Sequence, residues 1–164
     1  MGVGKSTIGR RLASRLNLPF VDADEEIERA AGLTITEIFE RYGEETFRDG
    51  ERRVIRRLLD GSVKVIATGG GAFVQDETRQ LILEQSIAVW IDADIDILVE
   101  RTSRRNTRPL LRTGDPKEIL TRLAGTRSPY YAKAPIHIRS GRGPHDAAVD
   151  AIITALHRQG YLTK

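Results

Sequence analysis

The chain has 164 residues, of which 26 are basic and 23 acidic, with a formal net charge of +3 and no cysteine. This length suits one domain around one core. The sequence has no apolar run that could cross a bilayer, no cysteine for a disulfide or thiolate metal site, and no signal-peptide pattern. We therefore expect a single domain over residues 1–164, no membrane partner and a cytoplasmic location.

The first part of the chain alternates helix and strand patterns. Ile8, Leu12 and Leu16 recur every four residues, which predicts an amphipathic helix after residue 7. Residues 18–24 form a short apolar run that ends in two carboxylates, as expected of a buried parallel strand that opens onto a site. Residues 25–60 are helical in pattern, and we expect them to form an insertion.

The insertion is expected to contain a helix over 25–31, a short helix capped by Thr36 and a longer helix over 44–59. The rest of the chain continues the alternation of strands and helices. We predict strands over 63–68, 87–92 and 135–139, helices near 77–85, 95–100, 117–126 and 146–157, and a mobile loop over 101–116. The sum predicts an α/β fold in three layers, with a parallel sheet flanked by helices.

Residues 2–7 read Gly-Val-Gly-Lys-Ser-Thr, the second half of the phosphate-binding pattern G-x-x-x-x-G-K-[ST]. In such a loop, backbone N–H groups at a helix N-terminus cradle the phosphates of a nucleotide. Lys5 would reach the transferred phosphate, and the Ser6 hydroxyl would bind Mg²⁺. The residues expected to bind ATP here are Gly2, Val3, Gly4, Lys5, Ser6 and Thr7.

The pattern's first glycine, and the strand that should feed the loop, would lie before Met1. We therefore expect the functional protein to be longer by about ten residues, a strand of five or six plus the start of the loop. Without that central strand, the chain as given should be marginally stable or inactive.

Further motifs follow in order along the chain: Asp22-Ala23-Asp24, Glu45-Thr46-Phe47-Arg48, Gly69-Gly70-Gly71, Arg108-Pro109-Leu110-Leu111 and Arg127-Ser128-Pro129-Tyr130-Tyr131. Together with the phosphate loop, they make the chain resemble shikimate kinase, a P-loop small-molecule kinase, over nearly its whole length. The resemblance implies transfer of the γ-phosphate of ATP to the 3-hydroxyl of shikimate, giving shikimate 3-phosphate and ADP. It also implies that residues 25–60 bind substrate and that 101–116 form a lid.

The resemblance implies that Arg48 and Arg127 hold the shikimate carboxylate, for which arginine forks are suited. An alternative for Arg48 is an ion pair on the helix surface with Asp49, Glu51 or Glu44. The glycines Gly69, Gly70 and Gly71 would let the backbone approach the substrate closely, and the alternative is a flexible turn.

Asp24 would accept hydrogen bonds from the substrate hydroxyls and, with Lys5 and Arg108, forms the expected catalytic set. Asp22 would stand near Mg²⁺, together with Ser6, and the alternative for the aspartate pair is a helix N-cap. The lid arginines Arg101 and Arg108, and less directly Arg142, would contact the nucleotide.

Two other functions fit parts of the pattern. Another small P-loop kinase, for gluconate or a nucleoside monophosphate, would share the phosphate loop but not the set of Arg48, residues 69–71 and Arg127. The arginines between 101 and 112 also suit a degenerate P-loop or nucleic-acid-binding module, but stacking aromatics are not interleaved with them. We therefore expect a monomeric enzyme with a small-molecule substrate, no nucleic-acid partner, and histidines in structural or surface roles.

Overall fold

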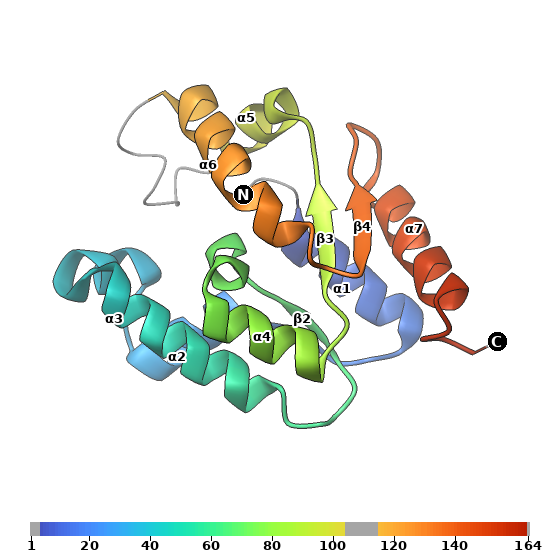
Figure 1. Cartoon of the computed structure of the whole chain (residues 1–164), viewed down its shortest axis with the longest axis horizontal. Helices are drawn as coiled ribbons and strands as arrows, with labels where there is room; N and C mark the ends of the chain where they lie inside the picture. The colour runs from blue at the N-terminus through green and yellow to red at the C-terminus, as the bar shows by residue number, and fades with distance from the viewer. Residues whose placement is uncertain (1–3, 104–114, 164) are drawn as a thin grey trace.

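The computed structural model describes residues 4–103 and 115–163 (Figure 1). Strands and helices alternate along these residues, as the sequence predicts. The elements are α1 (Lys5–Leu16), β1 (Phe20–Asp22), α2 (Ala23–Ala31), α3 (Ile35–Leu58), β2 (Val65–Ala67), the 3₁₀ helix η1 (Gly70–Val74), α4 (Asp76–Gln85), β3 (Val89–Asp92), α5 (Ile95–Ser103), α6 (Pro116–Tyr131), β4 (Ile136–Arg139) and α7 (His145–Arg158).

The helical insertion differs in detail from the prediction. Helix α3 is capped by Thr34, whose side chain accepts the Glu37 N–H while Glu37 reaches back to the Thr34 backbone. The predicted cap at Thr36 is therefore wrong, because this reciprocal capping box satisfies the helix N-terminus two residues earlier. Gly43 interrupts the helix with φ 84° and ψ 174°, a backbone conformation open mainly to glycine. This kink separates the two helices that were expected.

The predicted continuous parallel sheet appears as two parallel pairs within the described residues, β1 with β2 and β3 with β4. A cavity of about 600 Å³ lies along all of β2 and all of β3 and is also lined by α1. Among the described residues, β2 pairs only with β1, and β3 pairs only with β4, so each of these two strands is paired on one edge. The prediction of one sheet was wrong for these residues, because no described strand joins the two pairs.

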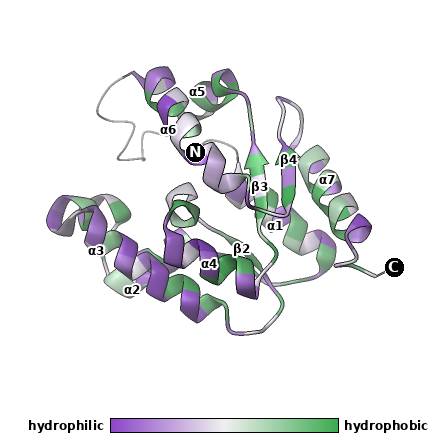
Figure 2. Cartoon of the chain, viewed as in Figure 1, coloured by the Kyte–Doolittle hydropathy of each residue, from purple (hydrophilic) through white to green (hydrophobic). Residues whose placement is uncertain are grey.

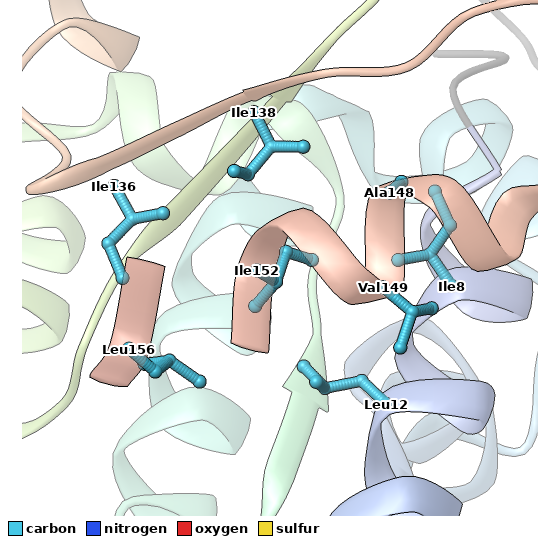
Figure 3. Close-up of a cluster of buried hydrophobic side chains, with 8 residues drawn as sticks. All are labelled: Ile8, Leu12, Ile136, Ile138, Ala148, Val149, Ile152 and Leu156. Atoms are coloured by element: carbon cyan, nitrogen blue, oxygen red, sulfur yellow. The ribbon is translucent and has the colours of Figure 1, made fainter. Parts of the chain in front are cut away.

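The largest apolar cluster joins elements from both ends of the chain (Figure 3). Side chains of α1, β4 and α7 pack together, and they are Ile8, Leu12, Ile136, Ile138, Ala148, Val149, Ile152 and Leu156. A second cluster joins α2, α3, η1, α4 and the start of β3. Burial of these apolar groups holds α1, and with it the phosphate loop, against the β3–β4 pair.

Hydropathy follows the burial of each element (Figure 2). In β4 the apolar Ile136 and Ile138 alternate with the exposed His137 and Arg139, the period expected of a strand with one covered face. Exposed turns of the helices carry polar residues. No helix within 4–103 and 115–163 is long and apolar enough to span a membrane.

The lid was expected over 101–116. Helix α5 continues to Ser103, so residues 101–103 are helical, and α6 begins at Pro116. The predicted loop is therefore wrong at 101–103, because the helix pattern of α5 persists for three residues beyond the predicted stop, and the role as a lid stays a prediction. Residues 104–114 lie outside the part that the structure describes.

Candidate active site

The phosphate loop leads directly into α1. Gly4 is the N-cap residue, with φ 82° and ψ 30°, and Lys5, Ser6 and Thr7 form the first turn, which carries no acidic residue. The N–H groups of the first turn and the positive end of the helix dipole therefore face the loop without a competing carboxylate on α1 itself. Gly2 and Val3 lie outside the described residues. This N-terminus has the chemistry to hold the phosphates of ATP.

His145, the first residue of α7, lies against Gly4. A Cβ added at Gly4 would come 2.6 Å from Cε1 of the imidazole. The sequence pattern predicts a structural or surface role for His145 and does not reveal its place beside the phosphate loop. No motif could have revealed it, because 141 positions of chain separate the two residues, counted as 145 minus 4.

Ser6, at the N-terminal end of α1, meets Asp22, at the C-terminal end of β1. The Ser6 hydroxyl donates to Oδ2 of Asp22 at 2.8 Å, while Oδ1 accepts the backbone N–H groups of Asp24 and Glu25 at 2.9 and 3.4 Å. Asp22 is therefore a helix cap and also faces the phosphate loop. The helix cap that was considered for Asp22 is present, and its role near Mg²⁺ stays a prediction.

Each glycine of the loop after β2 lies against a different functional residue. A Cβ added at Gly69 would come 3.3 Å from Oδ1 of Asp24, one at Gly70 would come 3.2 Å from Nη1 of Arg127, and one at Gly71 would come 2.6 Å from Cζ of Arg48. The contact at Gly71 is closer than a side chain allows, and the other two are tighter than most Cβ contacts, so the glycines let three separate elements converge on this loop. Helices α2, α3 and α6 supply one charged residue each.

Arg48 is nearly buried, with its side chain 12% exposed, and it pairs with Glu51 at 2.8 Å and with Glu44 at 3.4 Å. The ion pair that was considered as an alternative is therefore present, with the exposed Glu44 and the buried Glu51. It is not formed with Asp49, which pairs with Arg52 at 3.1 Å. Arg48 Nε is buried and has no hydrogen-bond partner among the described residues. The guanidinium thus keeps a donor for a ligand.

Glu51 was named in the sequence analysis only as a possible ion-pair partner, and its burial was missed. Its side chain is 2% exposed. Burial raises its pKa, while the neighbouring Arg48 charge and hydrogen bond oppose that rise. The i, i+3 spacing of Arg48 and Glu51 was the available signal, since such residues are neighbours on a helix. Glu51 fixes the direction in which Arg48 points.

Arg127 lies one turn before Tyr131 on α6, so both face the glycine loop. The Tyr131 hydroxyl donates to the Gly70 carbonyl at 2.8 Å. Among the described residues, no carboxylate lies within ion-pair distance of Arg127, which leaves its charge available to an anionic ligand. Tyr131 belongs to the motif of residues 127–131, but the motif alone predicts no role for it.

The remaining arginines expected at the nucleotide are only partly visible. Arg108 and the side chain of Arg101 lie outside the described residues. Arg142 forms a short ion pair with Glu100 of α5 and is mostly exposed. The pair ties the loop before α7 to α5. Contact of these arginines with ATP stays a prediction.

The protein groups near the phosphate loop could supply some, but not all, of the ligands of a magnesium ion. Within the described residues, no group of three His, Cys, Asp or Glu side chains could hold a metal ion. Ser6 and Asp22 supply two kinds of oxygen, which hard cations such as Mg²⁺ prefer. Because Mg²⁺ keeps several waters and uses nucleotide oxygens, two protein groups are enough for a kinase site.

The model of the shikimate kinase family matches residues 1–157. The chain belongs to the shikimate kinase family. The shikimate kinase of Novosphingobium aromaticivorans is 60% identical over 160 residues, which cover 95% of this chain and 83% of the relative. That of Zymomonas mobilis is 60% identical over 158 residues, 96% of this chain and 90% of the relative.

Solved structures agree with this family and with its fold. The shikimate kinase of Acinetobacter baumannii, in complex with shikimate, has a TM-score of 0.94 and 36% identity, covering 99% of this chain and 91% of that one. A gluconokinase of Sinorhizobium meliloti has a TM-score of 0.63 and 19% identity. At that identity the gluconokinase shows a shared fold alone. The predicted P-loop kinase fold is therefore confirmed, and the predicted family is confirmed with it.

Proposed function

We propose that this chain transfers the γ-phosphate of ATP to the 3-hydroxyl of shikimate. The observation that carries the proposal is the glycine loop of residues 69–71, against which Asp24, Arg48 and Arg127 converge. Shikimate is a small ring with one carboxylate and three hydroxyls, so it needs cations at one end and a hydrogen-bond acceptor at the other. The converging residues supply both.

Arg48 and Arg127 bind the shikimate carboxylate in this proposal. Arg48 has an unused buried Nε, and Arg127 has no carboxylate partner among the described residues. An arginine fork matches a carboxylate in two parallel hydrogen bonds. A ligand carboxylate would therefore meet two cations whose charges are already partly desolvated, which strengthens the attraction.

Asp24 accepts a hydrogen bond from the hydroxyl that attacks the phosphate. It follows Asp22 by two residues, and Asp22 contacts Ser6 of the phosphate loop at 2.8 Å. The contact of Asp24 with Gly69 and the contact of Asp22 with Ser6 support a role for Asp24 between the glycine loop and the nucleotide site. Holding the hydroxyl and the phosphate in line is the main contribution that a protein makes to phosphoryl transfer.

ATP binds at the N-terminus of α1, with its phosphates on the backbone N–H groups and on Lys5. The charges of Lys5 and Asp24 both act on Glu51, so the two site residues lie within electrostatic reach of one buried carboxyl. Ser6 and Asp22 hold Mg²⁺, which neutralises charge on the phosphate oxygens. Lys5 adds a second positive charge where the transferring phosphoryl group carries most negative charge.

Arg108, Arg101 and Arg142 complete the nucleotide site in this proposal. Arginines over the phosphates stabilise the charge of the transition state. The resemblance to the family supports Arg108 and Arg101, and the position of Arg142 before α7 supports a role near the base or ribose. We further propose that the enzyme acts as a monomer, that it needs no nucleic acid, and that it is cytoplasmic.

The function is tested by coupled ADP release with Mg-ATP and shikimate, gluconate or a nucleoside monophosphate. We expect release that depends on shikimate and on Mg²⁺, with phosphorus NMR of the product showing a phosphate ester at the 3-position. The matched control is Lys5→Ala, which should abolish turnover. Faster turnover of gluconate or of a nucleoside monophosphate, or salt-sensitive binding of RNA or DNA without kinase activity, would refute the proposal.

A further inference from the structure

Tyr131 occupies an unusual place between two parts of the site. Its hydroxyl donates to the Gly70 carbonyl at 2.8 Å across 61 residues of chain. A Cβ added at Gly70 would overlap this same hydroxyl and would come 3.2 Å from Nη1 of Arg127. The tyrosine oxygen, the glycine loop and the Arg127 guanidinium thus lie in direct contact.

The ring of Tyr131 is held independently of its hydroxyl. It packs against Trp90 of β3, with centroids 5.6 Å apart, and against Phe73 of η1 at 6.4 Å. Burial raises the pKa of the phenol, although the neighbouring Arg127 charge opposes the rise. The hydroxyl therefore stays protonated and remains a donor to Gly70.

The other face of the glycine loop contacts the second arginine. Gly71, next to Gly70, lies against Arg48, whereas Gly70 lies against Arg127. A shift of the loop relative to α6 would therefore change the separation of the two cations. The hydrogen bond from Tyr131 ties α6 to the Gly70 backbone, beside the packing of its ring on Phe73 and the approach of Arg127 to Gly70.

We infer that Tyr131 is a positioning residue for the shikimate carboxylate, because its hydroxyl fixes the glycine loop against α6 and so sets the spacing of Arg48 and Arg127. The inference rests on the proposed function and adds to it. Tyr131 itself touches neither the phosphate loop nor Lys5, so its effect falls on one substrate. A role in packing alone would instead depend on the ring, which has contacts of its own.

The test is Tyr131→Phe, which removes the hydroxyl and keeps the ring. We expect the KM for shikimate to rise about fivefold to tenfold, the size of effect expected for one lost hydrogen bond. The KM for ATP should change less than about twofold. Trp90 is the single tryptophan of the chain, and its unchanged emission would show that the ring packing is kept.

The matched control is Tyr130→Phe. Tyr130 is the preceding residue, and its ring lies 5.0 Å from the Arg79 guanidinium rather than at the glycine loop. This variant should leave the KM for both substrates unchanged. An unchanged KM for shikimate in Tyr131→Phe, or equal rises for shikimate and ATP, would overturn the inference, and so would the same rise in the control.

A second variant tests the contact itself. Gly70→Ala places a methyl group where the Tyr131 hydroxyl lies. It should raise the KM for shikimate more in the wild-type background than in Tyr131→Phe, because removal of the hydroxyl relieves the overlap. Equal rises in both backgrounds would count against the inference. Failure of the wild-type chain to phosphorylate shikimate would instead refute the proposed function.

Discussion

The guanidinium of Arg48 lies directly against Gly71, so closely that an added Cβ would come 2.6 Å from its Cζ atom. Gly71→Ala should therefore push Arg48 away from its pair with Glu51 and raise the KM for shikimate by about tenfold or more. The control is Gly50→Ala on α3, where an added Cβ meets nothing within 4 Å. Steady-state kinetics of both variants measure the effect, and similar KM values would show that Gly71 only provides flexibility.

Arg127→Ala removes one arm of the proposed carboxylate clamp. We expect the KM for shikimate to rise far more than that for ATP, by about 2 to 4 kcal/mol of binding energy for a desolvated charge pair. Arg122→Ala is the control, since Arg122 lies on the same helix and is exposed. Initial-rate kinetics with each substrate varied measure both KM values. Equal effects on the two substrates would contradict the role of Arg127 in binding the shikimate carboxylate.

Asp24→Asn keeps the shape of the side chain beside Gly69 but removes its charge. If Asp24 accepts the proton or hydrogen bond of the attacking hydroxyl, kcat should fall by about 10² or more. Binding of Mg-ATP, measured by calorimetry, should stay close to that of the wild type. A near-normal kcat would leave Asp24 with no part in the chemistry.

Glu51 makes the stability of the fold depend on pH. Burial raises its pKa above the ordinary value of 4.5, so the folded state holds the proton more tightly than the unfolded state does. This contribution to stability is complete below the ordinary value and is lost as pH rises through the raised pKa. In the wild type, the free energy of unfolding should therefore decrease as the pH rises above 4.5. In Glu51→Gln this decrease should be smaller. Urea unfolding at several pH values measures this, with Glu44→Gln, the more exposed partner of Arg48, as control.

The cavity along β2 and β3 has a volume of about 600 Å³ and extends to Arg127 and Tyr131 of α6. A strand residue occupies roughly 4.8 by 3.3 by 10 Å, or about 160 Å³. About 600 Å³ therefore corresponds to roughly four residues. A version extended upstream by an apolar strand, with a glycine three residues before Gly2, should unfold at a higher temperature and turn over shikimate faster.

The control for this extension is a serine-rich segment of the same length, which has little tendency to form a buried strand. Thermal unfolding and ADP release compare the three proteins. If the chain as given folds cooperatively and phosphorylates shikimate as fast as the extended version, the cavity needs no strand.

Much of the fold follows from local sequence patterns. Apolar spacing places the four strands and most helices within a few residues of their observed bounds, because period and capping chemistry act over one or two turns. The phosphate loop is visible in the same way, since its glycine and the first turn of α1 are neighbours in the chain. The cap at Thr36 was misplaced because two threonines, Thr34 and Thr36, offer similar local chemistry and only the partner Glu37 distinguishes them.

The sequence by itself determined the order of elements, the phosphate loop and, through its motifs, the family. Only the tertiary structure decided that Gly69, Gly70 and Gly71 each receive a different charged residue, that Glu51 is buried, and that Tyr131 ties α6 to the glycine loop. It also decided that the described strands form two separate pairs. These features depend on contacts between residues far apart in the chain, and such contacts leave no periodic or spacing signal in a single sequence.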